Sequence, residues 1–186
     1  GFMTLYHNNE AHFLDYREAA PAGASRDMYL DSQGEPSSDA SLIGHRASGI
    51  PGTVAGLAEA HRRFGSLPWK ELVKPAIALA DDGFIPEPWF LETIADAAPR
   101  FRGRTGFDKY FGGASTSTAF VQRELANTLK RIAISQGEDF YLGKTAQLLL
   151  AEMRRGGGLI NAEDLKNYRP LWRAPMRSTW RDYDIV

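Results

Sequence analysis

Arg17 is the residue of this sequence whose type and position best suit ligand binding. It ends an extended, β-prone run that leads into a loop, Leu14-Asp15-Tyr16-Arg17-Glu18-Ala19-Ala20-Pro21. Binding residues often lie on loops that a rigid scaffold positions. A guanidinium offers aligned donors that can hold a carboxylate bidentately. The alternative is a structural ion pair of Arg17 with Asp15 or Glu18, and spacing alone favours that alternative.

The other residue types that support catalysis form no recognisable motif. The histidines are His7, His12, His45 and His61, and none of them forms a metal-type pair on one helix face. The absence of cysteine excludes a thiolate nucleophile, a disulfide and a Cys-ligated metal. Gly156-Gly157-Gly158 follows a helical pattern, which predicts a helix C-terminus rather than a phosphate-binding loop. We therefore expect neither a metal nor a cofactor.

The charge balance argues against two classes of partner. The 186 residues carry 22 Lys and Arg and 23 Asp and Glu, for a net charge of −1. That balance gives no electrostatic reason to expect nucleic acid or an anionic membrane surface. No apolar run approaches the roughly 20 residues that span a bilayer. The arginines and tryptophans of residues 168–186 are offset by Asp182 and Asp184, which favours an extended segment with a solvated face.

The elements that must position Arg17 are predicted from periodicity. Two extended runs, residues 2–6 and 11–17, surround a polar turn and predict an antiparallel hairpin. Helical periodicity follows from Thr53 to Gly65 and from Pro68 to Gly83, where Pro75 predicts a kink or a break. The Pro- and Gly-rich residues 21–51 predict a loop.

The second half of the chain continues this helical pattern and then becomes extended. Further helical stripes cover residues 87–98, 125–133 and 146–153, and residues 99–118 are expected to be irregular. Asn161 and Asp164 have the spacing of a capping box. We expect an α+β segment, mainly helical with strands near both ends. Because it starts and stops within strands, we expect a piece of a larger protein; edge strands of a small domain are the alternative.

Several motifs together resemble the γ-glutamyltranspeptidase family. They follow the family order and cover nearly the whole chain. The motifs are Leu14-Asp15-Tyr16-Arg17-Glu18-Ala19-Ala20-Pro21, Gly49-Ile50-Pro51-Gly52-Thr53-Val54-Ala55-Gly56, residues 69–80 with Gly83-Phe84, Gly156-Gly157-Gly158-Leu159-Ile160, Asp164-Leu165-Lys166-Asn167-Tyr168 and Tyr183-Asp184-Ile185-Val186.

The resemblance implies a fold and a reaction. The family fold is the αββα sandwich of the N-terminal-nucleophile hydrolases, and residues 1–186 would form a single segment of its large subunit. The precursor cuts itself, and the new N-terminal Thr of the small subunit attacks the γ-glutamyl amide of glutathione or a related compound. Water or an acceptor amino acid then takes the acyl group. Arg17 would bind the substrate α-carboxylate, with Asp15 and Glu18 in support.

The resemblance also sets expectations for this chain by itself. The nucleophile and the small subunit are absent from it, so we expect no catalytic residue in this chain and no turnover by it alone. A periplasmic or secreted location is implied by the family only. A cephalosporin or poly-γ-glutamate acylase of the same fold, or a non-catalytic helical scaffold that binds carboxylates, are the alternatives.

Overall fold

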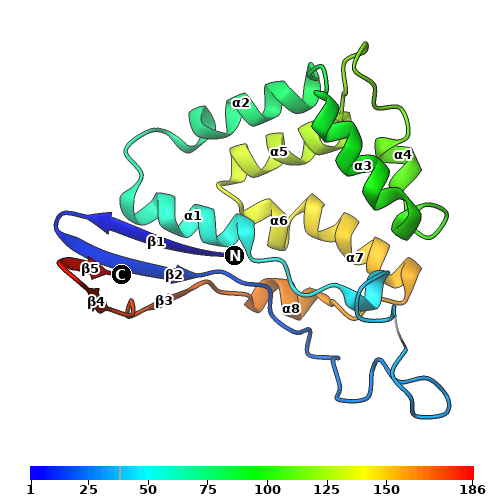
Figure 1. Cartoon of the computed structure of the whole chain (residues 1–186), viewed down its shortest axis with the longest axis horizontal. Helices are drawn as coiled ribbons and strands as arrows, with labels where there is room; N and C mark the ends of the chain where they lie inside the picture. Colours follow the sequence, from blue (N-terminus) through cyan, green and yellow to red (C-terminus); the bar gives the residue numbers. More distant parts are fainter. Residues whose placement is uncertain (38) are drawn as a thin grey trace.

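A computed structural model describes residues 1–37 and 39–186 (Figure 1). The strands are β1 (Phe2–His7), β2 (Glu10–Asp15), β3 (Leu171–Arg173), β4 (Ser178–Trp180) and β5 (Tyr183–Ile185). The helices are α1 (Thr53–Phe64), α2 (Trp69–Asp81), α3 (Pro88–Phe101), α4 (Phe107–Phe111), α5 (Arg123–Ser135), α6 (Glu138–Leu142), α7 (Lys144–Gly156) and α8 (Ala162–Asn167). The α+β class and the strands near both ends are confirmed. No helix among the described residues is both long and apolar enough to cross a membrane.

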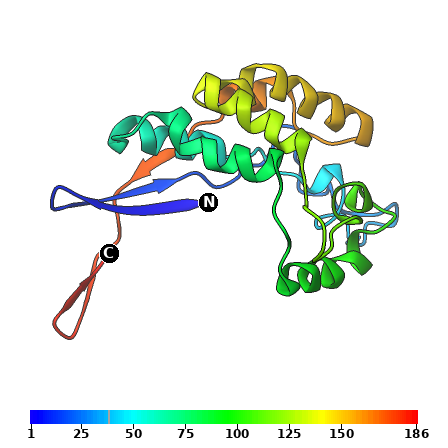
Figure 2. The same cartoon turned by 90° about the horizontal axis from the view of Figure 1, so that it is seen from above.

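The predicted hairpin is confirmed and forms two strands of a three-stranded sheet. β1 pairs with β2 in antiparallel register, from Phe2 opposite Asp15 to His7 opposite Glu10. Asn8 and Asn9 form the turn, with φ of 50° and 63°, the left-handed values that a two-residue hairpin loop requires. β3 then pairs antiparallel with β2 and completes the order β1-β2-β3. β4 and β5 form a separate hairpin that extends away from the helices (Figure 2).

One face of the three-stranded sheet is covered by α1. Phe64 of α1 contacts His7 and His12 of the hairpin and Trp172 of β3, with ring centroids 4.9–5.7 Å apart. The opposite face carries Phe2, which is 62% exposed. Figure 2 shows no other element of the described chain lying against that side of β1 and β2. The sheet is therefore buried on one face only.

Two glycines allow α1 to approach the end of β2 closely. A Cβ atom on Gly52 or Gly56 would overlap Tyr16, at its carbonyl oxygen in the first case and its ring in the second. A glycine inside a helix costs about 1 kcal/mol relative to alanine, so Gly56 is explained by this contact. The approach places the start of α1 beside the residues that follow β2.

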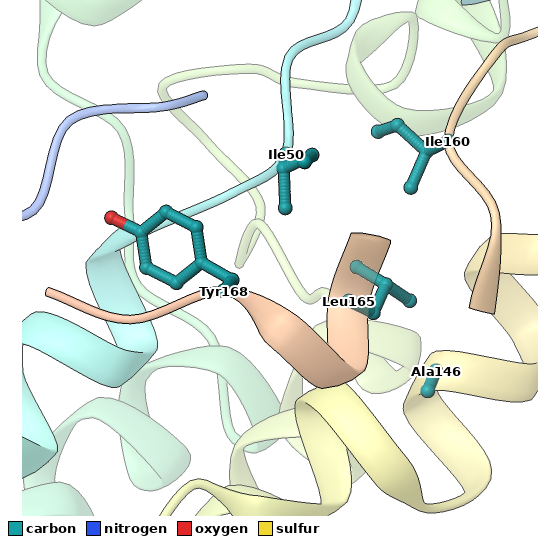
Figure 3. Packing of buried hydrophobic residues seen from close by; sticks show 5 residues of the cluster. All are labelled: Ile50, Ala146, Ile160, Leu165 and Tyr168. Carbon is teal, nitrogen blue, oxygen red and sulfur yellow. The ribbon is translucent and has the colours of Figure 1, made fainter. Parts of the chain in front are cut away.

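The core lies between α7, α8 and the segment that leads into α1. Its buried members are Ile50, Ala146, Ile160, Leu165 and Tyr168 (Figure 3). The α8 capping box is confirmed, because Asn161 Oδ1 accepts from the Asp164 N–H and Asp164 Oδ2 from the Asn161 N–H. The predicted cap after α7 is also confirmed, since Gly157 has a φ of 69° and donates to Met153.

The helices differ from the predictions in three places. α2 runs through Pro75 without a break, and it is tied to α5 near both ends, where Trp69 Nε1 donates to Ile132 O at 3.1 Å and Lys130 Nζ to Asp81 Oδ2 at 2.7 Å. Packing of this kind offsets the hydrogen bond that proline removes. Residues 99–118 contain the end of α3 and all of α4. The helix α6 was not predicted.

The described residues of the predicted loop, 21–37 and 39–51, contain turns, isolated bridges and a short 3₁₀ turn at His45–Ala47. Ser38 falls in this predicted loop and lies outside the described residues.

Candidate functional site

The ends of β2 and β3 open onto a groove of about 520 Å³. Its lining includes Asp15 at the end of β2 and Arg17 and Glu18 just after it. Tyr168 and Arg173 line it from the other end of the chain. The structure thus brings the three residues selected from the sequence into one place. It adds two residues that the sequence did not single out for the site.

The guanidinium of Arg17 is exposed at this groove and pairs with the carboxylate of Glu18. Arg17 Nη2 donates to Glu18 Oε1 at 2.9 Å, and the two side chains are 62% and 54% exposed. The hydrogen bond to Glu18 raises the pKa of Arg17, and the same bond lowers the pKa of Glu18. An exposed pair of this kind contributes little to folding. The guanidinium has five N–H donors, so this contact leaves donors available to a ligand.

The main chain at Arg17 is held more firmly than its side chain. The Arg17 N–H donates to Asp15 Oδ1 at 3.1 Å, and the Arg17 carbonyl accepts from the Tyr168 hydroxyl at 2.7 Å. Two residues further on, Ala19 and Ile50 exchange main-chain hydrogen bonds of 2.8 and 3.3 Å. These contacts fix the position from which the guanidinium projects.

Asp15 forms its hydrogen bond with Arg17 through the backbone N–H of that residue. Its Oδ2 accepts from Arg173 Nε at 2.8 Å, while Oδ1 takes the Arg17 N–H. The hydrogen bond from the Arg17 N–H, followed by that from Arg173, lowers the pKa of Asp15. The carboxylate therefore joins the ends of β2 and β3 as an anion.

Two stacked tyrosines, Tyr141 and Tyr168, contact the main chain near Arg17 and at the start of α1. We call them the tyrosine pair. Their ring planes lie 9° apart, with centroids separated by 5.9 Å. The Tyr141 hydroxyl donates to Pro51 O at 2.8 Å and accepts from the Ala55 N–H at 3.1 Å. It therefore caps α1, whose N-cap residue Gly52 has no side chain to do so. Burial raises the pKa of Tyr141 to about 12.

The histidines take packing and ion-pair positions outside the groove. His7 and His12 both pack on Phe64, as described above. His61 Nε2 lies 2.8 Å from Leu67 O, and His45 Nε2 lies 2.7 Å from Glu152 Oε1. The part of the chain that the structure describes holds no cluster of three or more His, Asp or Glu side chains suited to a metal ion.

Tyr168 and Arg173 were missed as residues of the groove. Tyr168 and Arg173 belong to the Arg- and aromatic-rich run that the sequence marked as extended. Nothing local to either residue indicates a contact with the segment after β2. Only a prediction of β3 pairing with β2 would have revealed it.

The fold and the groove together define an α+β protein with an arginine presented at its strand ends. The family model for γ-glutamyltranspeptidase matches residues 1–186. The chain belongs to the γ-glutamyltranspeptidase family.

Relatives of known name agree with that assignment. The chain is 50% identical over 181 residues to a glutathione hydrolase proenzyme of Pseudomonas aeruginosa, covering 97% of this chain and 32% of that protein. It is 38% identical over 191 residues to the glutathione hydrolase proenzyme of Escherichia coli K12, covering 100% of this chain and 33% of that protein. The chain thus spans about a third of the length of these curated relatives.

A solved structure extends the likeness to the fold. The γ-glutamyltranspeptidase of Pseudomonas nitroreducens, complexed with L-DON, superposes with a TM-score of 0.96 at 48% identity. The match covers 100% of this chain and 55% of that one.

Proposed function

We propose that this chain is part of the large subunit of an enzyme that transfers or hydrolyses γ-glutamyl groups, with Arg17 binding the substrate α-carboxylate. The observation that carries the proposal is the exposed guanidinium of Arg17 on a fixed backbone, at the mouth of a groove of about 520 Å³. Family membership supplies the reaction class. The proposed substrates are glutathione and related γ-glutamyl compounds.

The role proposed for Arg17 follows from its free donors. Two parallel N–H groups bind a carboxylate in one orientation, which would fix the γ-glutamyl group relative to an attacking nucleophile. Glu18 holds Nη2 from one side and restricts the guanidinium. Asp15 supports the same residue through its backbone. Neither carboxylate is proposed to exchange protons with the substrate.

The covalent chemistry is assigned to residues outside this chain. The proposed nucleophile is the N-terminal Thr of a small subunit cut from the same precursor. Its hydroxyl attacks the γ-glutamyl carbonyl, the amine leaves, and water or an acceptor amino acid breaks the resulting ester. No metal or cofactor is required by these steps. The 186-residue chain alone is proposed to be inactive.

The open face of the three-stranded sheet supports the proposed sandwich. Phe2 and Tyr6 of β1 are 62% and 70% exposed, and Leu171 of β3 is 49% exposed. The register places these residues on one side of the sheet, away from α1. A second sheet packed there would complete an αββα sandwich of the N-terminal-nucleophile type. Residues 1–186 would then be one segment of the large subunit and the small subunit its partner.

The proposed location is the periplasm or the cell exterior. This proposal rests on family resemblance, and the absence of cysteine is compatible with an oxidising compartment.

Intact mass measurement on the product of the complete reading frame tests the proposed enzyme. Two fragments, the smaller beginning with Thr, together with release of product from a γ-glutamyl anilide, are the expected result. A single uncut chain without γ-glutamyl activity would overturn the proposal. The separately expressed 186 residues serve as the control, and measurable turnover by them would contradict the assignment of the nucleophile to another segment.

A further inference from the structure

We propose that Tyr168 is a positioning residue for Arg17: its hydroxyl anchors the main chain beneath the guanidinium and thereby sets where the carboxylate-binding donors lie. This inference rests on the proposed role of Arg17 in binding the substrate α-carboxylate. It assigns to a core tyrosine a contribution to substrate binding without direct substrate contact.

The first observation is the rigidity of the anchor. Tyr168 is 9% exposed and belongs to the buried cluster with Ile50 and Leu165. Figure 3 shows its ring at the edge of this cluster, with the hydroxyl directed away from Leu165. Tyr141 stacks on the same ring. A buried tyrosine stacked in this way has few rotamers open to it, so its hydroxyl is a fixed point.

The second observation is the hydrogen bond that the Tyr168 hydroxyl makes. The Tyr168 hydroxyl donates to the carbonyl of Arg17 over a separation of 151 residues along the chain. The Arg17 side chain itself is 62% exposed, and the Glu18 side chain that it contacts is 54% exposed. The side chain therefore depends on its backbone for placement. Fixing that backbone before the ligand arrives reduces the ordering cost of binding.

The third observation is the space reserved for this contact. A Cβ atom on Gly52 would overlap the Tyr168 hydroxyl. Gly52 has a φ of −108°, which any residue can adopt, so its conformation does not require glycine. Close approach of the hydroxyl, together with the approach of Tyr16, explains the glycine here.

The tyrosine pair offers a matched control within the same stack. Tyr141 uses its hydroxyl to cap α1 through Pro51 and Ala55. It does not line the groove that holds Arg17. Removal of either hydroxyl leaves the ring stack intact and removes buried hydrogen bonds. The two variants therefore separate loss of stability from loss of Arg17 positioning.

The experiment is a double-mutant cycle in the complete processed enzyme, with kcat and KM measured on a γ-glutamyl anilide. Tyr168→Phe is expected to raise KM about 3- to 10-fold and to leave kcat within about twofold. In an Arg17→Ala background the same change is expected to alter kcat/KM less than about twofold, because its effect acts through Arg17. Tyr141→Phe is expected to lower Tm while KM stays within about twofold of the wild type.

Two results would overturn the inference. One is a Tyr168→Phe effect of equal size with and without Arg17, and the other is a KM effect shared equally by Tyr141→Phe. A wild-type enzyme without γ-glutamyl turnover, or an Arg17→Ala variant with unchanged KM, would instead reject the proposed function. The failures of the two proposals are thus distinguishable.

Discussion

Asp15 and Arg173 lie 158 positions apart in the chain, and their side chains meet at 2.8 Å. The contact joins the end of β2 to the end of β3 at the rim of the groove. Each oxygen of Asp15 already accepts one hydrogen bond from this chain, from Arg173 or from the Arg17 N–H. The carboxylate therefore serves to fix β3 and the Arg17 backbone at the rim of the groove. Arg17, with donors left over, can engage an anion there.

Replacement of Arg17 by Ala should weaken binding of a γ-glutamyl donor more than it slows turnover. Loss of a charge-assisted bidentate contact predicts a rise in KM of about 10- to 100-fold, with kcat reduced by less than about fivefold. Arg17→Lys should recover only part of the loss, because an ammonium cannot present two parallel donors. Steady-state kinetics on the complete enzyme measure both. Arg26→Ala, which removes an exposed arginine paired with Asp27, is the control, and an equal effect there would contradict the role.

Replacement of Gly52 by Ala should destabilise the fold. The added methyl overlaps the Tyr168 hydroxyl and the Tyr16 carbonyl, so the start of α1 must move. The expected loss in free energy of unfolding is about 2 kcal/mol or more. Gly113→Ala is matched to it, since a Cβ there meets no atom within 4 Å, and should change stability by less than about 0.5 kcal/mol. Urea titrations of both variants make the comparison, and equal midpoints would count against the packing argument.

Replacement of Asn161 by Ala should remove half of the α8 capping box. The Asp164 N–H loses its acceptor, and such a change costs about 1 kcal/mol. Asp164 also accepts from the Ala22 N–H at 2.9 Å, so the loss should extend to the segment after Pro21. Amide hydrogen exchange at Ala22 reports this directly. Asn167→Ala, at the exposed end of α8, should leave that exchange rate unchanged.

The stability of the protein should depend on Glu152 in acid. Arg155, and then His45, lower the pKa of Glu152 to about 2 from its ordinary value of 4.5. A carboxyl group whose pKa is lowered by folding gives its full stabilisation at any pH above its pKa in the unfolded chain. That stabilisation is lost as the pH falls through its pKa in the folded protein. The free energy of unfolding of the wild type should therefore fall as the pH is lowered from 4.5 to about 2. That of Glu152→Gln should fall less over the same pH range. Urea midpoints across the window test this, with Glu92→Gln of α3 as the control. Parallel curves for the wild type and Glu152→Gln would contradict it.

Sequence patterns predicted the features that depend on neighbouring residues. The Asn8-Asn9 turn, the Asn161 and Asp164 capping box and the glycine stop after α7 are all encoded within a few positions. These signals act locally through backbone conformation and short-range hydrogen bonds. They were sufficient for the class of fold and for the placement of Arg17 at a strand end.

The features that sequence patterns missed depend on distant partners. Pro75 predicts a kink or a break, because local rules cannot include the hydrogen bonds between α2 and α5. α6 has only five residues, too few for a helical period to show. The contacts of Tyr168 and Arg173 with the segment after β2 exist only once the ends of the chain meet. The groove thus forms through tertiary contacts between distant segments, whereas Arg17 could be selected from the sequence.

The same long-range contacts can form only after the late residues of this segment have been synthesised. The hairpin of β1 and β2 leaves the ribosome before the other described elements, and a lone hairpin is marginal in water. Tyr168 is synthesised 151 positions after Arg17, a delay of roughly 8–30 s at about 5–20 residues per second. During that interval the hairpin has neither β3 beside it nor the tyrosine hydroxyl at its end. The nascent chain must therefore keep an apolar strand pair from associating with other chains until Tyr168 and β3 emerge.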